Sequence, residues 1–448
     1  LEHRERSQAL FQQAVAEFGL EFLGWREAPV NLDALGEWAI SLRPYIAQAF
    51  IGRPPVLAAG DSFERALYLV RKRATQLCWA DSITNFYIAS LSAKTIVYKG
   101  LFVAPQLAKF YVDLTDPDFE TALAVFHQRY STNTFPTWER AQPFRLLCHN
   151  GEINTLRGNI NWMRAREADL ARSARPYFGD AVDYLAPVIS ERGSDSAMLD
   201  NALDLLVQTG RDIRHSLLML VPRAWKHDPE LPADVQAFYH YHACLQEPWD
   251  GPAALAFTDG VVVGSALDRN GLRPARYLMT DDGLVIMASE AGSVHVDQAR
   301  ITRRGRLGPG EMLTVDTASG ELLTTNEVAG RLAADKPYER WLRENLVELE
   351  DLLTPGRASA SSFGPGVRSA SARRRPASAA EASRELSTPA GGAAPLTGLQ
   401  AAFGYNREEL VVLFRPMWQQ GVEAIGSMGD DTPAAALSSL PRPLFHYF

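Results

Sequence analysis

Two stretches of this chain guide the interpretation of the rest. They are Gln128-Arg129-Tyr130-Ser131-Thr132-Asn133-Thr134 and Leu147-Cys148-His149-Asn150-Gly151-Glu152-Ile153-Asn154. We predict strands over Ala122–Tyr130 and Phe144–Leu147, so Asn150-Gly151 directly follows a strand. Asn-Gly in that place is a turn signal, because both residues accept positive φ at little cost. The same dipeptide also aims a side-chain amide and a backbone N–H at one point, which an oxyanion hole requires. Both interpretations stay open at this level.

Composition bounds the class of protein. The 448 residues are too many for one ordinary core, so two or more domains are expected. Hydrophobic residues make up 46% and charged residues 22%, which is typical of folded globular chains. A net charge of -8 argues against nucleic acid as the main partner. The longest apolar runs fall short of the roughly 18 residues of a membrane span, so no membrane association is predicted.

The three cysteines, Cys78, Cys148 and Cys244, are too few and too scattered for a disulfide framework or a zinc site of the CxxC type. They favour a reducing, cytoplasmic location. His240, His242 and Cys244 alternate and could share a metal ion, but no fourth ligand is evident. A packed helix or strand is the preferred interpretation, and no metal site is predicted.

The order of the predicted elements favours an α+β fold. Apolar, strand-like runs at 253–257, 261–266, 284–288 and 312–315 follow helical patterns at 155–170 and from Met198 onward. Many short strands with helices clustered between them indicate a layered sandwich rather than a βαβ repeat. Ser194-Asp195-Ser196 precedes the second helix, so one interpretation of Asp195 is simply an N-cap.

The chain divides by composition into three parts. Residues 354–394 consist mainly of Ser, Ala, Gly, Pro and Arg, which cannot bury enough apolar surface to offset their ordering entropy. We therefore predict a first domain over 1–345, a low-complexity linker over 346–397 and the start of another domain over 398–448. The chain begins at Leu1 without Met and ends in an aromatic run, so it is expected to be a piece of a longer polypeptide.

Five motifs occur in a fixed order along the chain. They are Arg129-Tyr130-Ser131-Thr132-Asn133, His149-Asn150-Gly151-Glu152-Ile153-Asn154-Thr155, Ser194-Asp195-Ser196, Asp268-Arg269-Asn270-Gly271-Leu272-Arg273-Pro274 and Gly426-Ser427-Met428-Gly429-Asp430-Asp431-Thr432-Pro433. Together they resemble the large subunit of the glutamate synthase family. The resemblance covers about residues 20–345 as its glutaminase domain, a class II amidotransferase of the N-terminal-nucleophile type. Residues 398–448 resemble the start of its central domain.

This resemblance implies a fold and an activity. The implied fold is a four-layer αββα sandwich, and the implied reaction releases ammonia from glutamine for reductive transfer to 2-oxoglutarate, making glutamate. By the same resemblance FMN and an iron–sulfur cluster belong to later domains, so this stretch is expected to hold no cofactor. The implied partners are glutamine, the remaining domains of the polypeptide, and a small NADPH-oxidising subunit or ferredoxin.

The resemblance also assigns roles to four residues. Arg129 would hold the α-carboxylate of glutamine with its fork of donors. Asp195 would meet the α-ammonium group. The Asn150 side-chain amide and the Gly151 backbone N–H would stabilise the tetrahedral oxyanion. Asn154 and Thr155 are expected to shape the turn, and Asp268 and Arg273 to brace the wall of the site.

One departure from the family pattern concerns the nucleophile. In the family it is an N-terminal cysteine whose own α-amino group acts as the base. Residue 1 is Leu and the first cysteine is Cys78, so the chain as given is expected to be inactive alone. Cys148 is not expected to replace it, because neighbours on a strand point to opposite faces and cysteine is commonly a small buried residue.

Two other functions remain open. One is another class II amidotransferase, such as amidophosphoribosyltransferase, which has a comparable Gly-x-Arg-Pro block; the Met428 motif and the length argue against it. The other is a non-catalytic remnant that binds glutamine without chemistry, which the missing nucleophile favours.

Overall fold

The computed structural model of the chain describes residues 3–129, 135–347, 405 and 409–424. The chain falls into two compact units, Leu1–Leu353 and Thr354–Phe448. The Tyr130–Thr134 part of the arginine motif, the low-complexity stretch 354–394 and the Met428 motif lie outside the described residues. In the second unit the structure describes the π-helix η6 (Leu410–Phe414) and helix α16 (Arg415–Gln420).

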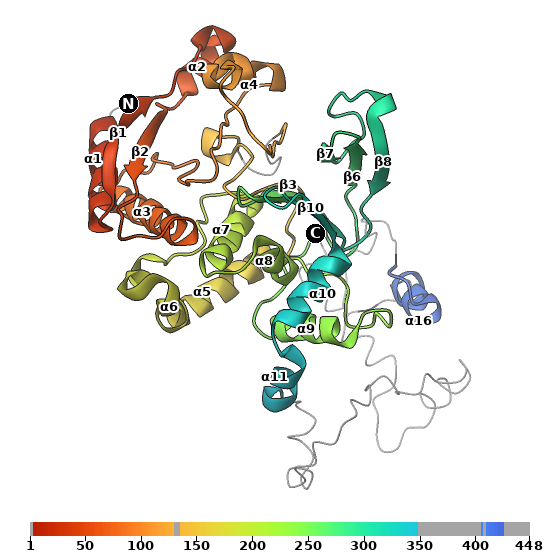
Figure 1. The fold of residues 1–448 in the computed structure, drawn as a ribbon. Coiled ribbons are helices and arrows are strands. Elements are labelled where there is room, and N and C mark those ends of the chain that lie inside the picture. The colour runs from red at the N-terminus through yellow and green to blue at the C-terminus, as the bar shows by residue number, and fades with distance from the viewer. Residues whose placement is uncertain (1–2, 130–134, 348–404, 406–408, 425–448) are drawn as a thin grey trace, which may run out of the picture. The chain divides into compact units, whose positions relative to one another are not determined.

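The N-terminal part of the first unit pairs two helices with a hairpin. Helix α1 (Arg4–Glu17) packs on α3 (Asp61–Ala80), and strands β1 (Glu21–Glu27) and β2 (Ala47–Gly52) are antiparallel beside them (Figure 1). Phe11 and Val15 of α1 and Leu67 of α3 are buried in their shared cluster. The shorter elements that follow are η1 (Leu32–Ala34), α2 (Glu37–Leu42), α4 (Ala104–Phe110), η2 (Val112–Thr115) and η3 (Trp138–Arg140).

A five-stranded antiparallel sheet forms the centre of the first unit. Its strands are β3 (Leu147–Gly151), β4 (Ala253–Thr258), β5 (Val262–Leu267), β9 (Met312–Asp316) and β10 (Glu321–Thr324). They lie in the order β10-β9-β5-β4-β3, so β3 forms one edge. The register sets Asn150 opposite Ala254 and Gly151 opposite Ala253.

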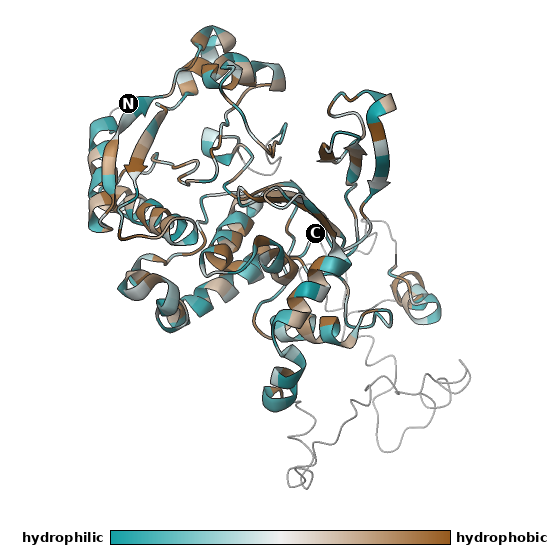
Figure 2. Ribbon diagram, in the orientation of Figure 1, coloured by the Kyte–Doolittle hydropathy of each residue, from teal (hydrophilic) through white to brown (hydrophobic). Residues whose placement is uncertain are grey.

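Helices cover one face of this sheet. They are α5 (Leu156–Ser173), α7 (Asp195–Gln208) and α8 (Ile213–Leu220), and they lie beside the strands in Figure 1. Alternate side chains of a strand share a face, and Leu147, Leu255 and Phe257 pack with Leu199 and Leu203 of α7 in the main core. The strands at the centre of Figure 2 are accordingly hydrophobic. Each of these side chains stabilises the fold by about 1.5–3 kcal/mol through burial.

The remaining elements surround this core. Strands β6 (Arg276–Thr280), β7 (Val285–Ala288) and β8 (Ile301–Arg306) form a separate three-stranded sheet, in the order β7-β6-β8, that projects as an arm (Figure 1). The others are α6 (Arg175–Phe178), η4 (Gly179–Tyr184), α9 (Ala233–Ala243), η5 (Gln298–Arg300), α10 (Thr325–Asp335) and α11 (Tyr338–Asn345). Among the described residues, no helix is long and apolar enough to cross a membrane.

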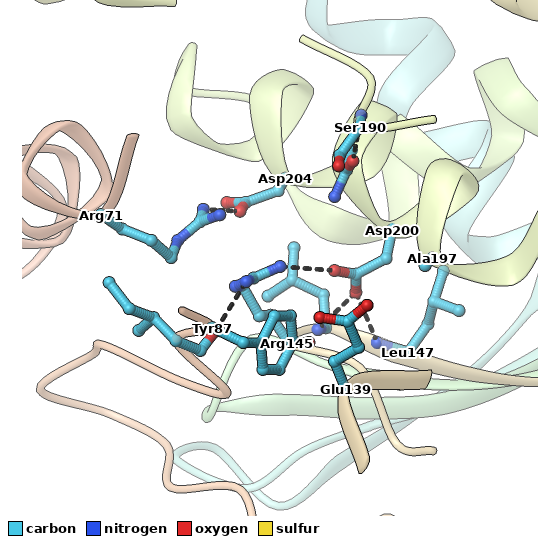
Figure 3. A network of polar contacts seen from close by, with 12 residues as sticks. Arg71, Tyr87, Glu139, Arg145, Leu147, Ser190, Ala197, Asp200 and Asp204 are labelled. Atoms are coloured by element: carbon cyan, nitrogen blue, oxygen red, sulfur yellow. Dashed lines mark hydrogen bonds and ion pairs between the residues drawn. The ribbon is translucent and has the colours of Figure 1, made fainter. Parts of the chain in front are cut away.

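A buried polar network ties α7 to the start of β3 (Figure 3). The Asp200 carboxylate accepts hydrogen bonds from the backbone N–H groups of Leu146, at 2.8 Å, and Leu147, at 3.3 Å. The Arg145 guanidinium lies 3.8 Å from the same carboxylate. Arg71 of α3 pairs with Asp204, one helical turn further along α7. Because a buried charge is costly without partners, these contacts fix where α7 lies along the strand.

Three sequence predictions meet the structure here. The α+β class is confirmed. The described part of the chain shows one helix layer on one face of the five-stranded sheet, which is two layers of the predicted four-layer sandwich. The interpretation of Asn150-Gly151 as a turn is wrong, because both residues belong to the end of β3 and pair with β4. The strand over Ala122–Tyr130 is also wrong in its described part, 122–129: the edge of β3 is occupied by the Gln142 side chain, which bonds both the N–H and the C=O of His149.

We expect Asp200→Ala to lower the free energy of unfolding by about 3 kcal/mol, because it leaves the Leu146 and Leu147 N–H groups without their acceptor and removes the carboxylate beside Arg145. Chemical denaturation measures this loss. Asp169→Ala is the matched control: its side chain is 75% exposed beside Arg172, so it should change stability by about 0.5 kcal/mol or less. Equal losses in the two variants would contradict the role of the network.

Candidate functional site

Strand β3 distributes its side chains over two faces. Leu147 and His149 point toward α7, whereas Cys148 and the exposed Asn150 lie on the opposite face. The Asn150 amide is therefore presented to solvent at the end of an edge strand.

Glycine is required at position 151. Its φ is +147°, and a Cβ there would lie 1.7 Å from the Pro252 carbonyl oxygen. The close approach continues at the next residue, where the Glu152 N–H donates to the same Pro252 oxygen at 3.0 Å. The backbone is thus held rigidly where the strand ends.

The Gly151 N–H points away from β4. Thr258 N–H donates to the Leu146 carbonyl at 2.8 Å, and Glu152 N–H donates to Pro252, so the hydrogen-bonded pairs fall on the even residues of this segment. Antiparallel pairing alternates, so the N–H groups of residues 147, 149 and 151 face the free edge. His149 N–H donates there to Gln142 Oε1 at 2.7 Å. The Asn150 amide and the Gly151 N–H therefore both emerge at one corner of the sheet.

Asp195 lies close to this corner. It is the first residue of α7, and Ser194, not Asp195, is the N-cap, with its hydroxyl accepting from the Ala197 N–H. Asp195 Oδ2 accepts from the Ile153 N–H at 2.8 Å, and Oδ1 accepts from the Ser196 N–H at 2.7 Å. The structure thus brings a buried carboxylate next to the segment that carries Asn150 and Gly151.

His149 was not among the predicted site residues. Its Nδ1 lies 2.9 Å from Ser196 Oγ and 3.9 Å from Asp195 Oδ2. Burial lowers the pKa of His149 below its usual value, against the opposing attraction of Asp195. Alternation along the strand indicates that His149 faces away from Asn150, but no pattern in the sequence shows which helix it meets.

Arg129 is exposed at the end of the described range 3–129. Its backbone N–H donates to His127 Nδ1 at 3.1 Å. Its guanidinium makes no hydrogen bond or ion pair with the described residues, so the structure does not bring Arg129 into contact with Asn150, Gly151 or Asp195. A Cys148 Sγ contact with the Phe126 carbonyl, at 3.6 Å, ties the segment to β3 nearby.

Cys148 lies on the same face of β3 as Asn150. Alternation along the strand therefore puts Cys148 on the opposite face from His149, but not from Asn150. Burial raises the pKa of its thiol to about 12. Only 4% of the residue is exposed. A nucleophilic cysteine needs an accessible thiolate, and this site favours the thiol.

Alkylation should therefore distinguish the cysteines. Under native conditions we expect iodoacetamide to modify exposed Cys244 first, and buried Cys78 and Cys148 only on unfolding, because burial raises the pKa of Cys78 to about 11 as well. Peptide mass spectrometry over a time course reads out each site. Rapid native labelling of Cys148 would contradict this assignment.

The other candidates have structural contacts. Asp268 Oδ1 accepts from the Ala253 N–H at 2.9 Å, and Oδ2 accepts from the Asn270 N–H at 2.9 Å. Within the described residues no ion pair joins Asp268 and Arg273, and the role of these two residues in bracing the wall of the site stays a prediction. Thr155 is the N-cap residue of α5, and Asn154 N–H donates to the Asp250 carbonyl at 2.7 Å, which places both at the turn.

The alternating His240, His242 and Cys244 do not converge. On helix α9, the His240 ring contacts the Trp225 ring. His242 Nε2 lies 2.8 Å from His215 Nε2. Cys244 is exposed. Within the described ranges, no group of three or more His, Cys, Asp or Glu side chains could hold a metal ion.

Comparison with known families places this geometry in context. The model of the class-II glutamine amidotransferases matches residues 1–341, and that of the glutamate synthase central domain matches residues 398–448. The chain belongs to the class-II glutamine amidotransferases. This confirms the family that the motifs predicted.

Known proteins resemble the whole chain. It is 42% identical over 448 residues to the glutamate synthase [NADPH] large chain of Azospirillum brasilense, covering 100% of this chain and 28% of that protein. It is 40% identical to the large chain of Bacillus subtilis, covering 100% of this chain and 27% of the relative. The chain thus spans less than a third of either relative.

Among solved structures, the glutamine phosphoribosylpyrophosphate amidotransferase of B. subtilis is 20% identical over 44% of this chain and 33% of its own. Its TM-score is 0.24, too low to carry an argument about the fold.

Proposed function

We propose that this chain forms the glutaminase part of a glutamate synthase, in which glutamine is hydrolysed to glutamate and ammonia. The observation that carries the proposal is the corner of the sheet where Asn150 and Gly151 end β3 beside the buried carboxylate of Asp195. Family membership and the identities to glutamate synthase large chains support it.

The polar groups suit the three charged or polarised parts of glutamine. Asp195 supplies a negative charge for the α-ammonium, and the Arg129 guanidinium supplies donors for the α-carboxylate. The Asn150 amide and the Gly151 N–H would then donate to the side-chain carbonyl oxygen as it becomes an oxyanion. Ammonia leaves when that intermediate collapses.

The proposal assigns the attack to an N-terminal cysteine upstream of these residues, as the resemblance implies. The thiolate adds to the amide carbon, and the α-amino group of the same cysteine carries its proton to the departing ammonia. Cys148 is not the nucleophile, because its thiol is buried and its pKa is raised.

The finer fold prediction also belongs to this proposal. The sheet face that carries Cys148 and Asn150 lies opposite the helix-packed core, and β3 has a free edge in the described part. A second sheet and helix layer against that face would complete the αββα sandwich.

The redox chemistry is proposed to lie in other domains. Cys78, Cys148 and Cys244 lie on separate elements, so the described residues do not fit an iron–sulfur cluster. We assign that cluster and FMN to the rest of the polypeptide, where ammonia would react with 2-oxoglutarate. Reducing equivalents would come from a small NADPH-oxidising subunit or from ferredoxin.

A glutamine-binding role without chemistry is the second candidate. It is favoured by the lack of any accessible thiol beside Asn150 among the described residues. Calorimetric binding of L-glutamine together with an ammonia-release assay separates the two candidates: binding without release, even with an upstream segment that begins with cysteine, would favour the second.

In a chain extended upstream to begin with cysteine, we expect Asp195→Asn to raise KM for glutamine about 10- to 100-fold with a smaller effect on kcat. The reason is the loss of a charge-assisted contact of about 1.5–3 kcal/mol. Arg129→Ala should act in the same direction.

Steady-state ammonia release measures both variants, with exposed Arg172→Ala as the matched control for Arg129. Wild-type KM in the Asp195 and Arg129 variants would remove the two anchors from the proposal.

We expect Asn150→Ala to lower kcat about 100- to 1000-fold in the same extended chain, with little change in KM, because its amide acts on the oxyanion rather than on bound glutamine. Single-turnover ammonia release provides the measurement. Asn150 is exposed, so the variant should unfold like wild type. A rise in KM with unchanged kcat would assign Asn150 to substrate binding instead.

A further inference from the structure

We propose that His149 is a positioning residue for glutamine binding: it orients the Asp195 carboxylate through Ser196, and protonation of its imidazole expels the substrate's ammonium group. The inference rests on the proposed role of Asp195. His149 lies on the face of β3 that points toward α7, opposite Asn150, and in this proposal it does not contact the substrate.

The carboxylate of Asp195 is nearly saturated by the protein. Oδ1 accepts from the Ser196 N–H at 2.7 Å and from Ser196 Oγ at 3.2 Å, and Oδ2 accepts from the Ile153 N–H at 2.8 Å. An ionised carboxylate has about four acceptor positions. Two are filled by backbone N–H groups and one by the Ser196 hydroxyl, which leaves one direction for the ammonium group of glutamine.

Ser196 connects this carboxylate to His149. Its hydroxyl has one proton, and when that proton is donated to Asp195, Oγ must accept from His149 Nδ1, at 2.9 Å. We therefore assign the imidazole proton to Nδ1. The other ring nitrogen, Nε2, is buried and makes no hydrogen bond within the described residues. The result is a relay from Nδ1–H to Oγ–H to Oδ1.

The charge state of His149 determines whether the Asp195 carboxylate is available to the ammonium group of glutamine. At neutral pH the imidazole is uncharged, since burial lowers its pKa, and the negative charge of Asp195 is available to the substrate. Protonation puts a positive charge 3.9 Å from Oδ2. That charge competes with the glutamine ammonium for the same carboxylate, and a buried pair of this kind is poorly screened.

Neighbouring groups shift the pKa of His149 and so determine the pH at which its imidazole becomes protonated. Asp195 favours the protonated imidazole, as does the Pro252 carbonyl, whereas His127 and Arg273 oppose it together with burial. The pKa of His149 is therefore below its usual value. Affinity for glutamine should be full above that lowered pKa and fall as the pH drops through it, by up to about tenfold per pH unit.

The test is calorimetric titration of the chain with L-glutamine between pH 7.5 and 5. We expect wild type to lose affinity progressively at the acid end. His149→Gln should bind about 2- to 10-fold more weakly at pH 7.5, because one hydrogen bond of the relay is lost. It should also lose the acid-dependent decline. His295→Gln, at an exposed histidine, should retain the wild-type profile.

A double-mutant cycle tests the relay itself. Ser196→Ala should weaken binding to the same extent as His149→Gln, and the double variant should be no weaker than either, because both break one chain of contacts. Ser196→Thr keeps a hydroxyl and should rescue binding. Additive losses would show that His149 and Ser196 act separately and would overturn the proposal.

A measurement on wild type needs no variant to fold. Glutamine should shift the titration of the His149 ring, followed by NMR of the imidazole nitrogens, to lower pH, since binding and protonation oppose each other reciprocally. No shift would overturn the inference. Weakened binding in Asp195→Asn with an unchanged acid profile in His149→Gln would defeat this inference alone, whereas wild-type binding in Asp195→Asn would defeat the proposed function.

Discussion

Helix α7 holds both ends of β3 through two buried carboxylates. Asp200 accepts the backbone N–H groups of Leu146 and Leu147 where the strand begins, and Asp195 accepts that of Ile153 just beyond its end. An edge strand otherwise exposes unpaired N–H groups on its free side. Here side chains from neighbouring segments supply part of that pairing, so the strand is held without a second strand beside it.

These contacts of Asp200 and Asp195 with the two ends of β3 explain why the candidate site lies at the end of the strand. Between the Gln142 contact at His149 and the Asp195 contact at Ile153, the described residues place no side-chain acceptor on the strand edge, and the Gly151 N–H faces that free edge. The close approach of Gly151 to Pro252 leaves no room for a side chain. The carboxylate that fastens Ile153 also has one acceptor direction left. A single helix end therefore supplies both the structural anchor and the proposed ammonium ligand, which couples the stability of the turn to the electrostatics of the site.

Sequence patterns predicted a large part of this arrangement. The motifs identified the family and the four site residues, and three of these, Asn150, Gly151 and Asp195, lie at one corner of the described structure. Arg129 stays apart from them in the described contacts, and the proposed roles of all four remain predictions. The errors concern local pairing: Asn150-Gly151 ends a strand, and 122–129 forms no strand, because Gln142 takes the edge position.

From the amino-acid order alone follow the α+β class and, through the resemblance of its motifs, the family; the alternation of His149 and Asn150 became visible only with strand β3. The class depends on the helical and strand-like periodicity of short segments, and the family depends on short motifs; both are local properties of the chain. The roles of Asp200, Gln142, Ser196 and His149 follow from packing instead. Each acts on a residue between 7 and 54 positions away, and such pairings depend on which helix covers the strand and in what register, a choice set by burial of the whole core.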